Sequence, residues 1–115
     1  MIIDVGKQLL DRLGYKVLIA RSGREALDTY KDYKDEIELV ILDLVMPDMG
    51  GGETYDKLKE LNPDIKVLLA SGYSINGQAQ AILDRGCDAF IHKPFSLIEL
   101  SQKIRAVVEK QLAAA

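Results

Sequence analysis

Three polar residues stand directly after short apolar runs, at positions where a buried strand would end. Asp43 follows LVIL, Ser71 follows KVLLA and Lys93 follows DAFIH. A carboxylate, a hydroxyl and an ammonium supply a nucleophilic oxygen, a hydrogen-bond donor and a cation, which phosphoryl transfer requires. Each residue alone also has a structural interpretation, because aspartate caps turns, Ser-Gly is a common turn pair and lysine is commonly exposed. Their shared position after three successive strands favours a phosphoryl-transfer site.

The composition is that of one compact domain. The chain has 115 residues, of which 48% are hydrophobic and 29% charged, so it can bury a core. The net charge of -3 without a basic stripe predicts no nucleic-acid partner. No apolar run approaches the ~20 residues needed to cross a bilayer, and the N-terminus lacks a cationic start. We therefore expect no membrane partner and a cytoplasmic location.

Two residues with reactive side chains have simpler structural interpretations. Cys87 is the only cysteine, so no internal disulfide forms, and in RGCDAFIH it is typical of a small buried thiol. His92 is interpreted as a strand-end surface residue. A proton-transferring histidine is the alternative, but no carboxylate partner is apparent for it.

Helical and apolar stretches alternate along the chain. Serine caps with a glutamate three residues later open two of the helices, at Ser22 and Ser96, and Gly14 and Gly86 stand where helices should end. We expect helices over 2–13, 24–33, 53–61, 77–86 and from Ser96 onward, and strands over 16–20, 39–42, 65–70 and 88–92. This alternation predicts parallel strands with right-handed crossovers, in a doubly wound, three-layer α/β domain over residues 1–115. Ligands of such sheets bind beyond the carboxyl ends of the strands.

The motifs VILDLVMPDMGG, VLLASGYS and DAFIHKPF closely resemble receiver domains of bacterial two-component response regulators, the CheY-like family. The resemblance covers nearly the whole chain, and SGYSINGQAQAIL and the final stretch are most similar to receivers attached to the carboxyl end of hybrid histidine kinases. It implies a flavodoxin-like fold and a phosphorelay in which a histidine kinase or phosphotransfer protein phosphorylates Asp43. An output domain or partner protein would then read the last helix-strand-helix face.

The same resemblance implies roles for residues near the acceptor. Lys93 would pair with the acyl phosphate, and Pro94 would follow a cis peptide bond. Ser71 would hydrogen-bond a phosphoryl oxygen, and Phe90 would be the aromatic switch that becomes buried when Ser71 moves. The glycines at 50–52 are expected to let the loop over the site adopt conformations barred to other residues.

Magnesium is the implied cofactor, held by Asp43 and the backbone carbonyl of Val45. Receivers normally begin with a strand ending in an acidic pair that completes the metal site, but this chain is expected to begin inside the first helix. Asp4 and Asp11 then come too late to replace the pair. The missing strand is internal in the order 2-1-3-4-5, and each unpaired buried backbone group costs ~1–3 kcal/mol. We therefore expect weak magnesium binding and low stability.

Three explanations of the missing strand stay open. Residues preceding Met1 could supply it, a homodimer could supply it by a strand swap, or the sheet could close differently and no longer accept phosphate. The leading function is a phosphoaccepting switch rather than a turnover enzyme. A receiver-like interaction module that is not phosphorylated is the alternative. A phosphohydrolase of the haloacid dehalogenase type is disfavoured, because it needs a second acid at the position of Val45.

Overall fold

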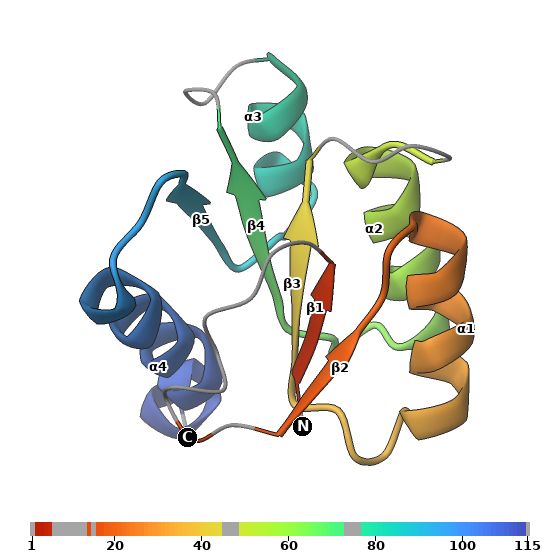
Figure 1. Cartoon of the computed structure of the whole chain (residues 1–115), viewed down its shortest axis with the longest axis horizontal. Helices are drawn as coiled ribbons and strands as arrows, with labels where there is room; N and C mark the ends of the chain where they lie inside the picture. The colour runs from red at the N-terminus through yellow and green to blue at the C-terminus, as the bar shows by residue number, and fades with distance from the viewer. Residues whose placement is uncertain (1, 6–13, 15, 45–48, 73–76, 115) are drawn as a thin grey trace.

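The computed structural model describes residues 2–5, 14, 16–44, 49–72 and 77–114. Five parallel strands form one sheet in the order β2-β1-β3-β4-β5 (Figure 1). The strands are β1 (Ile2–Val5), β2 (Val17–Ile19), β3 (Leu39–Asp43), β4 (Val67–Ser71) and β5 (Ala89–His92). This is the flavodoxin-like order of a doubly wound sheet, so the predicted fold class is confirmed.

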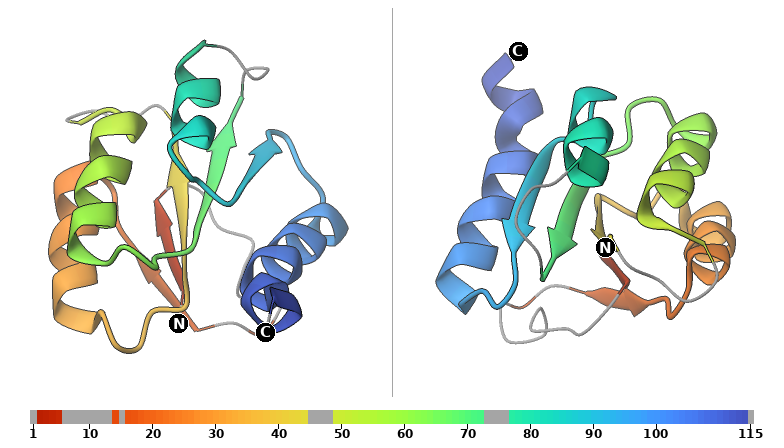
Figure 2. Two further views of the ribbon diagram at one scale, coloured as in Figure 1. Left: turned by 180° about the vertical axis from the view of Figure 1, so that it is seen from behind. Right: turned by 90° about the horizontal axis from the view of Figure 1, so that it is seen from above.

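The described helices cover the sheet on both faces. They are α1 (Gly23–Tyr33), α2 (Gly51–Leu61), α3 (Gly77–Asp84) and α4 (Leu97–Ala114). Helix α4 packs on the opposite face of the sheet from α1 and α2 (Figure 1, Figure 2). Within the described part of the chain, none of these helices combines the length and the apolar character that spanning a bilayer demands.

The sheet separates two hydrophobic cores, because successive strand residues point to opposite faces. In β3, Val40 and Leu42 belong to the core beneath α1, α2 and α3, whereas Leu39 and Ile41 belong to the core beneath α4. All four side chains are 5% exposed or less. Strands buried on both faces explain why the apolar runs show no alternation with polar residues.

The expectation that the chain begins inside a helix is wrong for Ile2–Val5, which form β1. Ile2 pairs with Val17 of β2 on one side and with Leu39 of β3 on the other. The internal place of the sheet is therefore filled by the chain's own strand. The three explanations of a missing strand, the strand swap among them, and the argument for low stability lose their basis. The rest of the predicted first helix, residues 6–13, lies outside the described residues.

Both predicted serine caps are confirmed. The Ser22 hydroxyl accepts a hydrogen bond from the Glu25 amide at 3.1 Å, and the Ser96 hydroxyl accepts one from the Glu99 amide at 3.1 Å. These side chains satisfy amide groups that have no partner inside the helix. Gly86 follows α3 with a φ of 110°, the left-handed conformation that glycine adopts without a Cβ clash.

Gly51 serves close packing, and the absence of a positive φ at the glycines 50–52 corrects the expectation of unusual backbone conformations there. Positive φ values among the described residues occur at Gly14 and Gly86 instead. A Cβ on Gly51 would lie 2.9 Å from Leu44 Cα and 3.1 Å from the Asp43 carbonyl oxygen. The Gly51 amide also donates to the Leu44 carbonyl at 3.1 Å. The first turn of α2 thus rests directly on the backbone at the end of β3.

We predict that Gly51→Ala lowers the free energy of unfolding by about 1–3 kcal/mol, because the added methyl group meets backbone that cannot rotate away. Gly50→Ser is the matched control, since nothing lies within 4 Å of a Cβ at that position and serine is a preferred N-cap. Urea unfolding of both variants measures the difference. Equal stabilities of the two variants would contradict the close approach at Gly51.

Candidate functional site

The three predicted polar residues lie at the same edge of the sheet, at the carboxyl ends of neighbouring strands. Asp43 is the last residue of β3, Ser71 the last of β4, and Lys93 follows β5. Asp43 is paired with Ala70, and Ser71 is paired with His92, so the three strands end at the same level. Parallel register therefore gathers residues that are far apart in the sequence.

The Lys93 side chain reaches from β5 across β4 to β3. Its ammonium donates a hydrogen bond to Asp43 Oδ2 and forms an ion pair with that carboxylate. The two side chains are 34% and 19% exposed, so water screens the pair only partly while the carboxylate stays accessible. Ser71 beside them is buried, at 1% exposed. The site thus combines an accessible carboxylate, a cation in contact with it and a neighbouring buried hydroxyl residue.

The short edge strand β5 is held at both ends by hydrogen bonds to β4. Before the strand, the Asp88 carboxylate accepts from the Val67 amide at 2.8 Å. After it, the Lys93 amide donates to the Ser71 carbonyl at 2.7 Å. These bonds extend the pairing beyond the four residues of β5 and fix its register. The direction of the Lys93 side chain is thereby fixed too.

Other residues singled out in the sequence surround this pair. The peptide bond between Lys93 and Pro94 is cis. Phe90 is partly buried and packs against the core beneath α1, α2 and α3. His92 is exposed at the end of β5, as interpreted from the sequence. Val45, the expected carbonyl ligand, lies outside the described residues.

The described residues do not by themselves form a magnesium site. Asp43 contributes one carboxylate, and no three His, Cys, Asp or Glu side chains of the described chain are grouped to hold a metal ion. Asp4 was expected on a helix, but its backbone lies in β1, paired with Ile41 of β3. Its side chain is outside the described part. The sequence signal for this placement was the apolar pair before Asp4, which fits a strand as well as a helix.

Two buried groups have raised pKa values and are poor nucleophiles. Burial raises the pKa of the Cys87 thiol to about 11, and the Sγ lies 3.4 Å from the Val67 carbonyl oxygen. Burial likewise raises the pKa of Tyr55 to about 12, and its hydroxyl has no hydrogen-bond partner within the described part of the chain. Both groups are therefore protonated at neutral pH. The interpretation of Cys87 as a buried structural thiol is confirmed.

With the fold and the strand-end residues described, sequence comparison identifies the family of the chain. A family model described as the response regulator receiver domain matches residues 1–105. The chain belongs to this family of two-component signal transduction.

Relatives and solved structures agree with that assignment. Sensor kinase CckA from Brucella abortus is 36% identical over 106 residues, which cover 92% of this chain and 11% of that protein. Response regulator MprA from Mycolicibacterium vanbaalenii is 35% identical over 97 residues, covering 84% of this chain and 41% of that protein. A CheY-like receiver domain protein from Methanospirillum hungatei JF-1 superposes with a TM-score of 0.83 at 30% identity, covering 99% of this chain and 95% of that one.

The chain spans less than half of the length of CckA and of MprA. The similarity to a sensor kinase agrees with the expected likeness to receivers of hybrid histidine kinases.

We predict that Cys87 reacts slowly with a thiol reagent such as DTNB at pH 8. A rise in pKa from 9.0 to about 11 lowers the thiolate fraction about a hundredfold, and burial restricts access further. The same protein unfolded in urea is the control and should react at the rate of a free thiol. Equal rates for the folded and unfolded protein would show that the thiol is accessible and ionises normally.

Proposed function

We propose that this domain accepts a phosphoryl group on Asp43 from the phosphohistidine of a histidine kinase or phosphotransfer protein. The observation that carries the proposal is the contact of the Lys93 ammonium with the Asp43 carboxylate at the carboxyl edge of the sheet. Ligands of doubly wound sheets bind at this edge. The family membership supports the same reaction.

In the proposed reaction, an Asp43 carboxylate oxygen attacks the phosphorus atom and forms an acyl phosphate. The bond between phosphorus and the histidine nitrogen breaks, and its electron pair returns to the imidazole. Lys93, already at Asp43, moves its ammonium to a phosphoryl oxygen and balances charge that the carboxylate alone would repel. Ser71, on the adjacent strand end, turns its hydroxyl to donate to another phosphoryl oxygen.

The output we propose is a change of conformation rather than turnover of a substrate. Movement of Ser71 would free space next to β5, where Phe90 is already partly buried. Phe90 would then become more buried and alter the face formed by α3, β5 and α4. A partner protein or an output domain would read this face. The proposed location is the cytoplasm.

Magnesium, when bound, would supply additional positive charge at the phosphoryl group. We retain the expectation that its binding is weak, because among the described side chains Asp43 contributes one carboxylate and magnesium prefers several oxygen ligands. Val45, through its carbonyl, is the further ligand that the family resemblance implies.

We predict that incubation with acetyl phosphate and magnesium adds one phosphoryl group per chain, detected by intact mass. Asp43→Asn should abolish the addition, because the amide is not a comparable nucleophile. Asp28→Asn, an exposed carboxylate on α1, is the control and should leave it unchanged. Continuous release of phosphate would instead indicate a hydrolase, and absence of both outcomes would favour an interaction module that is not phosphorylated.

Replacement of Lys93 tests the proposed role of its ammonium separately. Lys93→Gln should slow phosphorylation by about a hundredfold, as removal of a preorganised charge-stabilising donor does in other active sites. Lys57→Gln removes an exposed lysine of α2 and should have no effect. The rate of phosphoryl addition measures both variants, and an unchanged rate for Lys93→Gln would exclude Lys93 from the reaction.

A further inference from the structure

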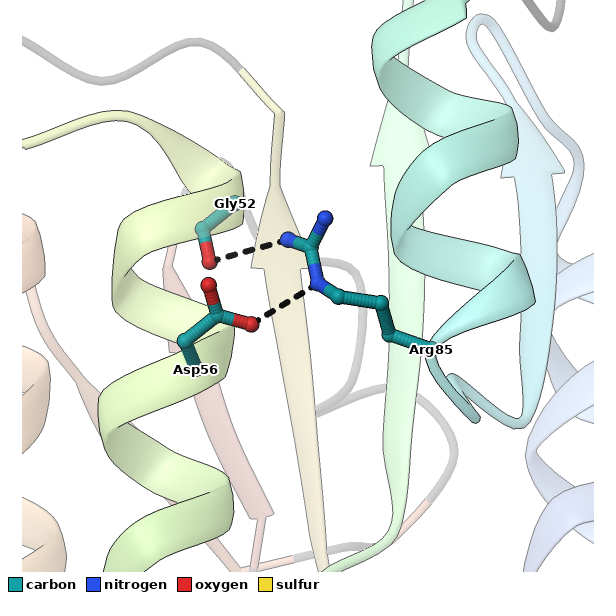
Figure 3. Close-up of polar contacts among 3 residues, drawn as sticks. All are labelled: Gly52, Asp56 and Arg85. Carbon is teal, nitrogen blue, oxygen red and sulfur yellow. Dashed lines mark hydrogen bonds and ion pairs between the residues drawn. The ribbon is translucent and has the colours of Figure 1, made fainter.

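Arg85 bridges two helices that meet close to the acceptor strand. Figure 3 shows its side chain leaving the end of α3 and reaching the side of α2. Its Nε donates to Asp56 Oδ1 at 2.9 Å, and its Nη2 donates to the Gly52 carbonyl at 3.4 Å (Figure 3). One guanidinium thus contacts two positions, a helical turn apart, on one face of α2.

The backbone of Arg85 is fixed where the side chain departs. Its amide lies 3.2 Å from the carbonyl oxygens of both Ala81 and Ile82, at the end of α3. The following glycine, Gly86, ends the helix in the left-handed conformation. Arg85 is therefore anchored to α3 at its backbone and to α2 at its guanidinium.

The facing surfaces of the two helices are separated in part by a groove that the Arg85 side chain lines. A groove of about 310 Å³ lies between them, and its walls include Leu44, residues 50–52 and Ile82. Helix α3 has eight residues and buries two of them, Ala79 and Ile82. A helix of this length is marginal without tertiary contacts, so a side chain that spans the groove has a large effect on its position.

The first turn of α2 transmits any displacement to the acceptor strand. Gly50, its N-cap, provides no side-chain hydrogen bond, and the Thr54 amide and hydroxyl both donate to the Gly50 carbonyl at 3.0 Å. Gly51 donates its amide to the Leu44 carbonyl and leaves no room for a Cβ against the backbone of Asp43 and Leu44. A shift of this turn must therefore move the end of β3 or break the contact.

We propose that Arg85 is a positioning residue that holds the first turn of α2 against the end of β3 and thereby keeps Asp43 placed for phosphoryl transfer. The proposal rests on the proposed phosphorylation of Asp43. It assigns Arg85 and Asp56 a role in the rate of the reaction although neither touches the acceptor. The planar guanidinium is suited to this role because it contacts the Asp56 carboxylate and the Gly52 carbonyl at the same time.

Amide hydrogen exchange of the unphosphorylated protein tests whether Arg85 holds the first turn of α2 in place. The Gly51 and Thr54 amides, which donate to Leu44 and Gly50, report opening of the first turn of α2. In Arg85→Gln and in Asp56→Asn these amides should exchange about threefold to fivefold faster, the range that a partly exposed ion pair contributes. The Val40 amide in the central sheet should exchange as in wild type, which controls for global destabilisation.

A conservative variant and a matched ion-pair variant sharpen this test. Arg85→Lys keeps the charge but loses the planar guanidinium, and its effect should be intermediate. Lys57→Gln removes the Lys57–Glu53 pair, which lies within α2 and spans no groove, and should change nothing. Unchanged exchange at Gly51 and Thr54 in Arg85→Gln would overturn the proposal.

Phosphorylation by acetyl phosphate tests whether Arg85 affects the rate at which Asp43 accepts a phosphoryl group. Arg85→Gln and Asp56→Asn should each slow phosphoryl addition about threefold to fivefold, and the double variant should slow it no further than either single one. Faster exchange with an unchanged rate would overturn the positioning role. If wild type is not phosphorylated while Arg85→Gln still accelerates exchange, the proposed function fails and the bridge between α2 and α3 is confirmed as a structural contact.

Discussion

The register of one short edge strand decides whether this domain has a site at all. β5 has four residues, and a slip of one residue would turn every side chain to the opposite face of the sheet. The Asp88 carboxylate before the strand and the Lys93 amide after it prevent that slip by bonding to β4 at both ends. Each bond contributes roughly 1 kcal/mol net. The ion pair between Lys93 and Asp43 depends on these two hydrogen bonds, because they hold Lys93 at the end of β5.

A second constraint is steric rather than electrostatic. The carboxyl end of β3 is where the chain leaves the sheet, and α2 begins so close to it that a side chain at Gly51 would collide with the strand backbone. Because interiors are packed like solids, such a contact transmits displacement instead of absorbing it. The acceptor carboxylate is thus supported from β5 by charge and from α2 by contact between backbones.

The sequence was sufficient for the parts of this structure that depend on local pattern. Alternation of helical and apolar stretches predicted the parallel doubly wound sheet, and the serine caps predicted where α1 and α4 begin. The strand-end positions of Asp43, Ser71 and Lys93 followed from that order, because parallel strands end at one edge. Each of these inferences needs only periodicity and short-range hydrogen bonding.

The features that sequence analysis missed depend on contacts between distant segments. Residues 2–5 fit a helical stripe and a strand equally well, and pairing with both β2 and β3 decides between them. The glycines at 50–52 suggested free rotation, whereas the structure uses Gly51 for close approach. Arg85 and Asp56 are 29 residues apart, so no local rule could pair them.

The division of the interior into two cores limits how the helical layers can influence each other. Among the described residues, the buried side chains beneath α4 form a separate cluster from those beneath α1, α2 and α3, so an influence from one cluster to the other passes through the strands. β5 lies at the edge of that partition, where Phe90 packs with one core and the next residue, Ile91, packs with the other. A rotation of this edge strand would move Phe90 and Ile91 in opposite directions and so displace side chains in both cores at once. Two adjacent residues of the edge strand, Phe90 and Ile91, therefore couple the two helical layers mechanically.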